Sequence, residues 1–523
     1  MSADTTLGSV PSSRDDGDPY LLRQLAGLEA LQQLAQADHA GSGLARPTRD
    51  RVEEIDAWRR GEVGRRRGFD DPAVERQSRG GVPHPGDSRG YPRRYRGLPA
   101  VDGPGAATSH ALITAAATAV LSSVAVVVVR LPVSPVLIGY WVLGAAIITV
   151  CLTSFVRGRR FTHLPPARGR VLAIIPAYNE YPQDNLNACV RSLLAQTIPI
   201  DKIVVVDDGS VRPVRPFRAP NVEWIRQENT GKRGAQVTAL RMFHRDEFRF
   251  ILTVDSDSRP HPDALEHLLR AMSHRKVQAA TGWIYIRNFA ESWVARAADI
   301  DIGGSCVMMR ASRSMLGALE TTSGALALYR SEILYDHLDE YAVECGTGDD
   351  RWLAMRALLR GEVVGVAEAA VDTDMPPTLK GTYKQRLRWA RSWWWMVPFA
   401  YSRLSWKQLI SPTYGLISLG IAPVVLCWAV FSWIVGFQAR LAHPQVALAF
   451  IGTYIVVRYA LTALYLAGRP GMSRWQKLIS LVAGTPAALL LNLFLLMPTR
   501  YYALTRLNDN RWQTRQVPVG DPQ

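Results

Sequence analysis

The sequence predicts an α/β fold in which a doubly wound, mostly parallel sheet forms a catalytic domain flanked by transmembrane helices. Three observations predict this class. Short apolar runs alternate with helical segments between residues 171 and 375, which is the pattern of parallel strands joined by crossover helices. Polar clusters follow three of these runs. Uncharged stretches long enough to cross a bilayer precede and follow the region.

Composition narrows the class further. The 523 residues carry 61 Lys plus Arg against 46 Asp plus Glu, a net charge of +15, and 48% are hydrophobic. That hydrophobic share is too high for a disordered chain and too low for a mostly membrane-embedded transporter. The five Cys include no C-x-x-C pair, which argues against a disulfide scaffold and a thiolate zinc site.

The basic excess also indicates which partners to expect. Residues 1–108 are neutral, so the whole excess lies in residues 109–523, beside the apolar runs. Basic residues next to apolar spans favour an anionic lipid bilayer as the partner. Because the sequence has no clustered basic helix and no base-reading motif, we expect no nucleic acid partner.

The N-terminal region differs in character from the rest. Residues 1–108 are rich in Gly, Pro, Ser, Asp and Arg and are predicted to be mostly disordered. Within residues 21–40 leucines recur on one helical face, which is typical either of an amphipathic helix or of a transient helix in a flexible tail.

Two transmembrane helices are predicted within residues 109–157. The uncharged stretches Ala111–Val129 and Leu131–Val156 are each close to or above the ~20 residues that a helix needs to cross the hydrocarbon. Five Arg follow, between residues 157 and 170. By the positive-inside rule they place the next domain in the cytoplasm, and the protein as multi-pass in the inner (plasma) membrane.

Residues 168–400 are predicted to form the catalytic domain, with interfacial helices. Its first strands are expected at Val171–Ile175, Ile203–Val206 and Phe250–Val254. Ligands bind at the carboxyl ends of the strands in such sheets. There the sequence has three polar clusters, which are Pro176–Glu180, Asp207–Ser210 and Asp255–Asp257.

Residues 401–505 are predicted to hold further transmembrane helices, and residues 506–523 a tail. The uncharged runs are Gln408–Ala439, Leu441–Val457 and Leu478–Thr499. The first is long enough for one kinked span. The last contains Gly484 and Pro486 and fits either a spanning or a re-entrant helix, so the number of spans stays open.

The pair Asp255 and Asp257 is the candidate metal site. Residues i and i+2 of an extended segment point to the same side, so both carboxylates could meet one hard divalent cation that also holds a diphosphate. A D-x-D alone is weak, but here it follows the β-type run Phe250–Val254. The alternative is a solvated turn after a strand.

Two further segments carry charge in turns. Gly231–Gly234 contains Lys232 and Arg233 in flexible backbone, which suits phosphate oxygens but is also a common surface loop. Gly346–Arg351 is an acidic turn before a helix expected at Trp352–Leu359. Its carboxylates either cap that helix or act as a general base.

A basic and aromatic segment follows. Helical spacing puts Gln385, Arg388 and Trp389 on one face, where the guanidinium could bind a diphosphate and the indole could stack on a sugar ring. Trp393–Trp395 suits an aromatic belt at the membrane interface better than Trp389 does.

Taken in order, these motifs resemble processive, membrane-bound family 2 glycosyltransferases over residues 112 to 515. The motifs are Asp207-Asp208, Gly231-Lys232-Arg233, Asp255-x-Asp257, Gly348-Asp349-Asp350-Arg351 and Gln385-x-x-Arg388-Trp389. Within that family the chain is most similar to the branch of hyaluronan synthases and chitin-oligosaccharide synthases. The segments close to that branch are Gly348–Arg351, Asp372–Pro376 and Trp512–Arg515.

The resemblance implies a GT-A fold and an inverting hexosyltransferase that moves sugar from a UDP-sugar to a growing β-linked polysaccharide. Mg2+ or Mn2+ is the implied cofactor. The implied donor-binding side chains are Tyr178, Asp207, Asp208, Lys232, Arg233, Asp255, Gln385, Arg388 and Trp389. The metal is implied on Asp255 and Asp257, the general base at Asp350 beside Asp349, and the acceptor against Ser323, Gly324 and Trp389.

The sequence departs from the family pattern at two places that bear on the product. Arg386 stands where the family often has a second Gln, and the acceptor-side Cys common in hyaluronan synthases has no clear counterpart near Ser323. Three functions therefore stay open: a polymerase that exports its product, a single-addition transferase acting on a lipid acceptor, and a membrane anchoring protein with an inactive fold. The donor sugar is not fixed by the sequence.

Overall fold

The computed structural model describes residues 161–345, 348–439 and 444–507. The predictions for residues 1–108 and 109–157, and for the tail from residue 508 onward, lie outside these ranges.

The described residues form one sheet in the order β3-β2-β1-β4-β7-β6-β8-β5. The strands are β1 (Val171–Ala177), β2 (Lys202–Asp208), β3 (Val222–Gln227), β4 (Phe250–Thr253), β5 (Arg259–Pro260), β6 (Val277–Ile286), β7 (Ala327–Arg330) and β8 (Glu362–Thr373). Strands β3, β2, β1 and β4 are mutually parallel, and β6 is parallel to β8. Strand β7 runs antiparallel to both β4 and β6, and β5 runs antiparallel to β8. The predicted class of a mostly parallel sheet is confirmed, and the three expected strands are β1, β2 and β4.

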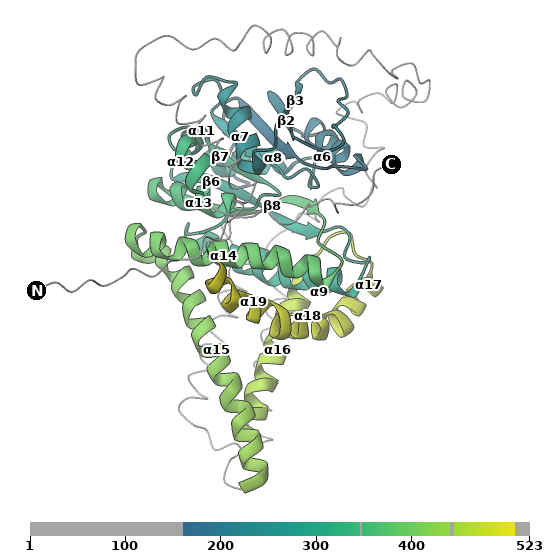
Figure 1. Ribbon diagram of the computed structural model, residues 1–523, viewed down its shortest axis with the longest axis vertical. Helices are drawn as coiled ribbons and strands as arrows, with labels where there is room; N and C mark the ends of the chain where they lie inside the picture. The colour runs from purple at the N-terminus through teal and green to yellow at the C-terminus, as the bar shows by residue number, and fades with distance from the viewer. Residues whose placement is uncertain (1–160, 346–347, 440–443, 508–523) are drawn as a thin grey trace, which may run out of the picture. The chain divides into compact units, whose positions relative to one another are not determined.

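Helices cover both faces of the sheet, as a doubly wound fold requires. They are α6 (Asp184–Leu194), α7 (Gly231–Arg241), α8 (Ala264–Met272), α9 (Trp293–Ile302), α10 (Met309–Met315), α11 (Ser331–Tyr335), α12 (Leu338–Glu344) and α13 (Asp349–Arg360), with a π-helical segment η3 (Gly303–Met308) between α9 and α10. Figure 1 shows these helices arranged around the strands.

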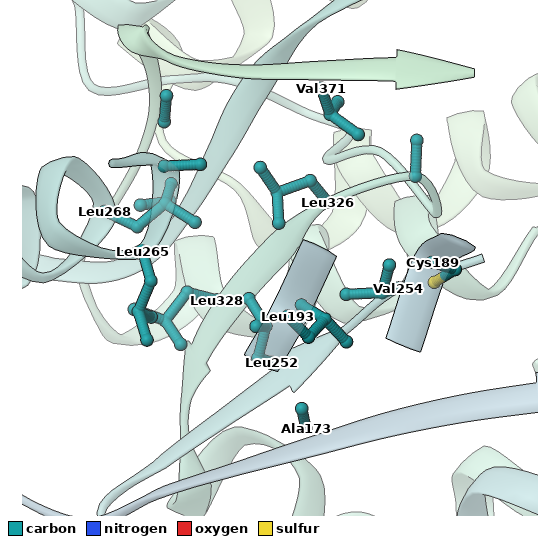
Figure 2. Close-up of a cluster of buried hydrophobic side chains, with 14 of the residues drawn as sticks. Ala173, Cys189, Leu193, Leu252, Val254, Leu265, Leu268, Leu326, Leu328 and Val371 are labelled. Carbon is teal, nitrogen blue, oxygen red and sulfur yellow. The ribbon is translucent and has the colours of Figure 1, made fainter. Parts of the chain in front are cut away.

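Alternating side chains of the strands feed two separate cores. In β1, Ala173 and Ile175 belong to the core formed with α6 and α8, while Leu172 and Ile174 belong to the core formed with α7 and α13. Successive strand side chains point to opposite faces, so one fully buried apolar run serves both cores. Figure 2 shows the first core, where Ala173 lies with side chains of α6 and α8.

The C-terminal part of the chain is helical. It contains α14 (Leu379–Arg403), α15 (Trp406–Ala439), α16 (Pro444–Gly468), α17 (Arg474–Ile479), η4 (Ser480–Gly484), α18 (Thr485–Leu491), η5 (Asn492–Leu496), α19 (Met497–Tyr502) and η6 (Ala503–Arg506). The run expected as one long span is the single helix α15, which packs along α16 (Figure 1). Helix α14 contains Pro398 and ends at Arg403.

The last helical stretch is apolar. In the described part of the chain, residues 474–506 form a helix long and apolar enough to cross a membrane, and residues 454–468 form a shorter apolar helix. The longer stretch includes the π-helical segments η4 and η5 and packs against α9 and α14.

Candidate active site

The parallel strands bring three predicted clusters to one edge of the sheet. Strand β1 lies between β2 and β4, with Ala177 paired to Asp207 and Ile174 paired to Thr253. The chain leaves all three strands at their carboxyl ends on that edge, and there it carries the Tyr178 loop, the Asp207-Asp208 pair and the Asp255–Asp257 segment. The expectation that these clusters share an edge is therefore met.

Asp207 and Asp208 are buried and hold neighbouring backbone. Asp208 accepts hydrogen bonds from the backbone N–H groups of Thr230 at 2.9 Å and Gly231 at 2.8 Å. Asp207 accepts backbone N–H bonds from the loop after β2. Burial raises the pKa of Asp208, although these bonds oppose the shift. Asp208 thus fixes the turn that opens α7, one residue before Lys232, while Asp207 fixes the loop after β2.

Tyr178 lies in a loop that is hydrogen-bonded to the loop after β2. Its neighbour Asn179 has a left-handed φ of 54°. The Asn179 N–H donates to Ser210 Oγ at 2.8 Å, and Asn179 Oδ1 accepts from the Val211 N–H at 2.9 Å. Tyr178 is half-buried. Its contact with uridine, like that of Asp208, stays a prediction.

Lys232 forms ion pairs with one carboxylate of the predicted metal site and with one carboxylate beside the predicted base. Its Nζ lies 2.8 Å from Asp255 Oδ1 and 2.8 Å from Asp349 Oδ2. The Lys232 and Asp349 side chains are only 15% and 10% exposed, whereas that of Asp255 is 37% exposed. Burial alone would lower the pKa of Lys232, but the two carboxylates raise it well above its ordinary range. Asp255 and Asp349, which are more than ninety positions apart in the sequence, therefore meet at the ammonium group of Lys232.

Asp257 is held by hydroxyl groups beside Asp255. Its Oδ1 accepts hydrogen bonds from Thr373 Oγ1 at 3.2 Å and Ser258 Oγ at 3.3 Å. Burial, followed by the charges of Asp255 and Asp374, raises the pKa of Asp257 to about 6. A bound cation would stabilise the ionised form of a carboxylate such as Asp257, whose pKa is raised by its surroundings.

Asp349 and Asp350 stand in the first turn of α13, and their pKa values are shifted in opposite directions. Burial would raise the pKa of Asp349, but the charge and hydrogen bond of Lys232, with help from Arg388, lower it below its usual value. For Asp350, burial and then the negative charge of Asp349 raise the pKa. The helix starts three residues earlier than expected, at Asp349, so both carboxylates also stand in the first turn, where the helix dipole favours negative charge.

The predicted acceptor loop lies against the Lys232 ion pair. A Cβ added at Gly324 would come within 2.7 Å of Asp255 Oδ2 and 2.9 Å of Lys232 Nζ, so a larger residue here would displace the ends of these two side chains. Ser323 is buried, and its N–H donates to Thr281 Oγ1 at 3.0 Å. The structure thus brings Ser323 and Gly324 to the site.

Helix α14 closes the site from the other side. A Cβ at Gly348 would collide with Ser392 of α14, which shows how closely the helix packs on the acidic turn. Arg388 is near the same carboxylates: burial lowers the pKa of its guanidinium, while the charges of Asp349 and Asp255 oppose that shift. Gln385 and Trp389 lie on the same helix and are half-buried. Arg233, on α7, is close enough to help lower the pKa of Asp349.

The carboxylates at Asp255 and Asp257 fit a divalent cation in part. They are adjacent, one is substantially exposed, and hydroxyl groups orient the other. Among the described residues no group of three or more His, Cys, Asp or Glu side chains is arranged to hold a metal ion. A cation here would therefore take its remaining oxygen ligands from a substrate diphosphate or from water, as Mg2+ commonly does.

Comparison with known proteins agrees with this geometry. Residues 166–392 match the family model described as glycosyltransferase like family 2. A hyaluronan synthase from Streptococcus pyogenes is 31% identical over 377 residues, which cover 66% of this chain and 83% of the relative. The chain belongs to glycosyltransferase family 2. It is therefore a sugar-transferring enzyme of the GT-A fold.

Other relatives in the family come from rhizobia. An N-acetylglucosaminyltransferase from Rhizobium meliloti is 31% identical over 368 residues, covering 66% of this chain and 82% of the relative. One from Mesorhizobium japonicum is 30% identical over 379 residues, covering 68% and 86%. A solved mannosyltransferase from Pyrobaculum calidifontis, in complex with GDP-Man and Mn2+, has a TM-score of 0.42 and 19% identity, covering 68% of this chain and 97% of that one.

The structure adds residues that the sequence did not single out. Thr322 donates from Oγ1 to the Asp350 carbonyl at 3.0 Å, and its own carbonyl accepts from Arg310 Nη2 at 3.0 Å. Thr373 binds Asp257, as described above. Thr373 lies within Asp372–Pro376, a segment that resembles the hyaluronan synthase branch, so the sequence could have indicated it. Nothing in the sequence links Arg310 to the site.

Proposed function

We propose that this glycosyltransferase moves sugar from a UDP-sugar to a growing β-linked polysaccharide with inversion at the anomeric carbon, as a processive synthase in the inner membrane. The observation that carries the proposal is that Lys232 joins the predicted metal site to the predicted base region. Its Nζ lies 2.8 Å from both Asp255 and Asp349. Similarity to hyaluronan synthase and to rhizobial N-acetylglucosaminyltransferases supports a polysaccharide or oligosaccharide product.

In the proposed reaction Asp350 is the general base. Its raised pKa suits a group that must take a proton near neutral pH. The acceptor hydroxyl loses its proton to the Asp350 carboxylate and its oxygen bonds to the anomeric carbon. The bond from that carbon to the UDP oxygen breaks, and UDP leaves with the electron pair. Attack opposite to the leaving group inverts the configuration.

Cations around the diphosphate stabilise the leaving group. Lys232, Arg233 and Arg388 are the protein's own cations here, and each is close enough to shift the pKa of Asp349. Asp255 and Asp257 would hold Mg2+ or Mn2+, which when bound neutralises charge developing on the departing diphosphate. Trp389 offers an aromatic face for the acceptor sugar.

Two variants test the base. Asp350→Asn should lower transfer by roughly 10²–10⁴-fold, the usual worth of a general base, while UDP binding is retained. Asp339→Asn is the matched control, because Asp339 stands in the first turn of α12 with an 88% exposed side chain. UDP release is measured both with membranes that contain the enzyme and with the purified enzyme, for a panel of UDP-sugars. Full turnover in Asp350→Asn would reject the assignment.

Product length separates the proposed polymerase from a single-addition transferase. Radiolabelled product is sized on a gel and digested with enzymes specific for each linkage. A ladder of long chains supports polymerisation, and a labelled lipid of one added sugar supports the glycolipid alternative. Recovery of the polymer inside sealed inverted vesicles would support export, because the catalytic domain then faces outward.

A further inference from the structure

Arg386 occupies an unusual place beside the predicted sugar-stacking residue. Its guanidinium carbon lies 4.3 Å from the centroid of the Trp389 ring, three residues along α14. Its Nη2 lies 3.0 Å from Asp301 Oδ2, and the two side chains are 10% and 9% exposed. The ring of Trp389 is thus in contact with a buried charge that comes from its own helix and is anchored on another.

The orientation of the guanidinium favours the ring over the carboxylate. Although Nη2 is within ionic distance of Asp301, neither Nη2 nor Nε has a hydrogen-bond partner in the described ranges 161–345, 348–439 and 444–507. A buried ion pair is weak as a source of stability because desolvation offsets the attraction. The contact with the indole therefore accounts better for the position of the Arg386 guanidinium.

The anchor is rigid. Asp301 lies near the end of α9, and the following Gly303 packs so closely on Tyr465 of α16 that a Cβ would come within 2.4 Å of its ring. One turn earlier, Ile300 contacts Gly484 of η4, where a Cβ would lie 2.7 Å from Ile300 Cδ1. The backbone on either side of Asp301 in the sequence is therefore packed against α16 and η4, which belong to the apolar C-terminal part.

From this geometry we infer that Arg386 is a positioning residue. It holds one face of Trp389 at an angle set by Asp301, so that the other face meets the acceptor sugar. The inference rests on the proposed function, in which Trp389 binds the acceptor. It extends that function by assigning acceptor affinity and product length to Arg386 and Asp301, two residues outside the predicted donor-binding and catalytic set.

Three variants separate stacking from charge. Arg386→Gln removes both, Arg386→Lys keeps the ion pair without the planar stack, and Asp301→Asn keeps the stack but loosens the anchor. Lys380→Gln is the matched control, because it removes an exposed positive charge from the same helix. We expect the KM for an acceptor oligosaccharide to rise roughly three- to tenfold in Arg386→Gln and in Arg386→Lys, from the usual strength of a cation–π contact. The KM for the UDP-sugar should stay within about twofold, and products should become shorter.

A spectroscopic readout tests the ring directly. The protein is labelled with 5-fluorotryptophan, and the Trp389 resonance is assigned by its loss in Trp389→Phe. The 19F shift should move in Arg386→Gln and Arg386→Lys, move less in Asp301→Asn, and stay in place in Lys380→Gln. An unmoved resonance in Arg386→Gln, an Arg386→Lys variant equal to wild type, or equal changes in donor and acceptor KM would each overturn the inference.

The outcomes also distinguish this inference from the proposed function. If wild type transfers no sugar to any acceptor, the proposed function fails. If wild type is active and Arg386→Gln matches it, the role of Arg386 alone fails. Should Arg386→Gln not fold, Arg386→Lys and Asp301→Asn carry the same test, since each keeps a polar group of similar size in place.

Discussion

Lys232→Met is the sharpest test of how the site is held together. The substitution keeps an unbranched side chain but removes the ammonium that lies 2.8 Å from both Asp255 and Asp349. Asp349 is left buried without its main counter-charge, which costs ~3–5 kcal/mol when one partner of a buried pair is removed. The contact with Asp255 adds at most about 1 kcal/mol, because that carboxylate is 37% exposed and is screened by solvent.

The contribution of Asp349 to the pH dependence of stability should change in this variant. In wild type the lowered pKa of Asp349 contributes stability that is present above the ordinary carboxyl value of ~3.9 and is lost as pH falls through the folded pKa. The raised pKa of Lys232 contributes stability that is lost only as pH rises above its ordinary range. In wild type this ion pair should therefore add no slope to the stability between pH 5 and 8, where the slope comes from groups with a raised pKa such as Asp257. In Lys232→Met the pKa of Asp349 rises instead, so the variant should gain more stability than wild type as pH falls from 8 to 5.

Thermal unfolding in detergent between pH 5 and 8 measures both effects. Lys202→Met is the control, because Lys202 Nζ lies 2.7 Å from Glu223 Oε2 in a pair whose side chains are 27% and 30% exposed. Such a pair should contribute no more than ~1 kcal/mol. Equal destabilisation by the two substitutions, or a Lys232→Met variant without the acid-side gain, would refute the view that one buried lysine joins the two halves of the site.

Two further predictions concern the metal site and the acceptor loop. Because the pKa of Asp257 is raised to about 6, protons should compete with Mn2+ below that pH, and the apparent affinity measured by electron paramagnetic resonance with UDP present should fall by up to ~10-fold per pH unit. The same shift costs stability above about pH 6, a cost that disappears below ~3.9, so unfolding midpoints without metal should rise on acidification. Gly324→Ala should push aside the ends of the Asp255 and Lys232 side chains, because its Cβ would lie 2.7 Å from Asp255 Oδ2 and 2.9 Å from Lys232 Nζ, and should therefore lose more transfer activity than stability. Gly420→Ala is its control, since a Cβ there meets nothing within 4 Å. An Mn2+ affinity that does not change with pH would count against the first prediction, and equal effects of the two alanine substitutions would count against the second.

The sequence predicted the part of the site that depends on strand ends. The runs beginning at Val171, Ile203 and Phe250 are apolar throughout, and parallel strands place their carboxyl ends on one edge. That rule was enough to bring Asp207, Asp208 and Asp255 together. The antiparallel strand β7 between β4 and β6 was not expected, because four residues, Ala327–Arg330, carry too little periodicity to be distinguished from a helical segment.

Contacts between distant segments could not be predicted from local patterns. Nothing near Arg386 indicates that its partner is Asp301, 85 positions earlier in the sequence on another helix. Nor does the sequence separate Asp349 from Asp350, which are identical neighbours in one turn. Their difference comes from which side chain faces Lys232, and that depends on how α7 packs beside α13 through the shared core.

The unequal pair at the start of α13 gives each aspartate a different chemical role. A carboxylate whose pKa is lowered by a bonded ammonium holds its proton poorly and serves best as a fixed negative charge. A neighbour whose pKa is raised by burial and by that fixed charge accepts a proton more readily than an ordinary carboxylate. Asp349 thus acts on Asp350 through its charge, and Lys232 keeps that charge in place. Because the same ammonium contacts Asp255, a change in ionic contacts on the donor side reaches the proposed base through two ion pairs, without any movement of the sheet.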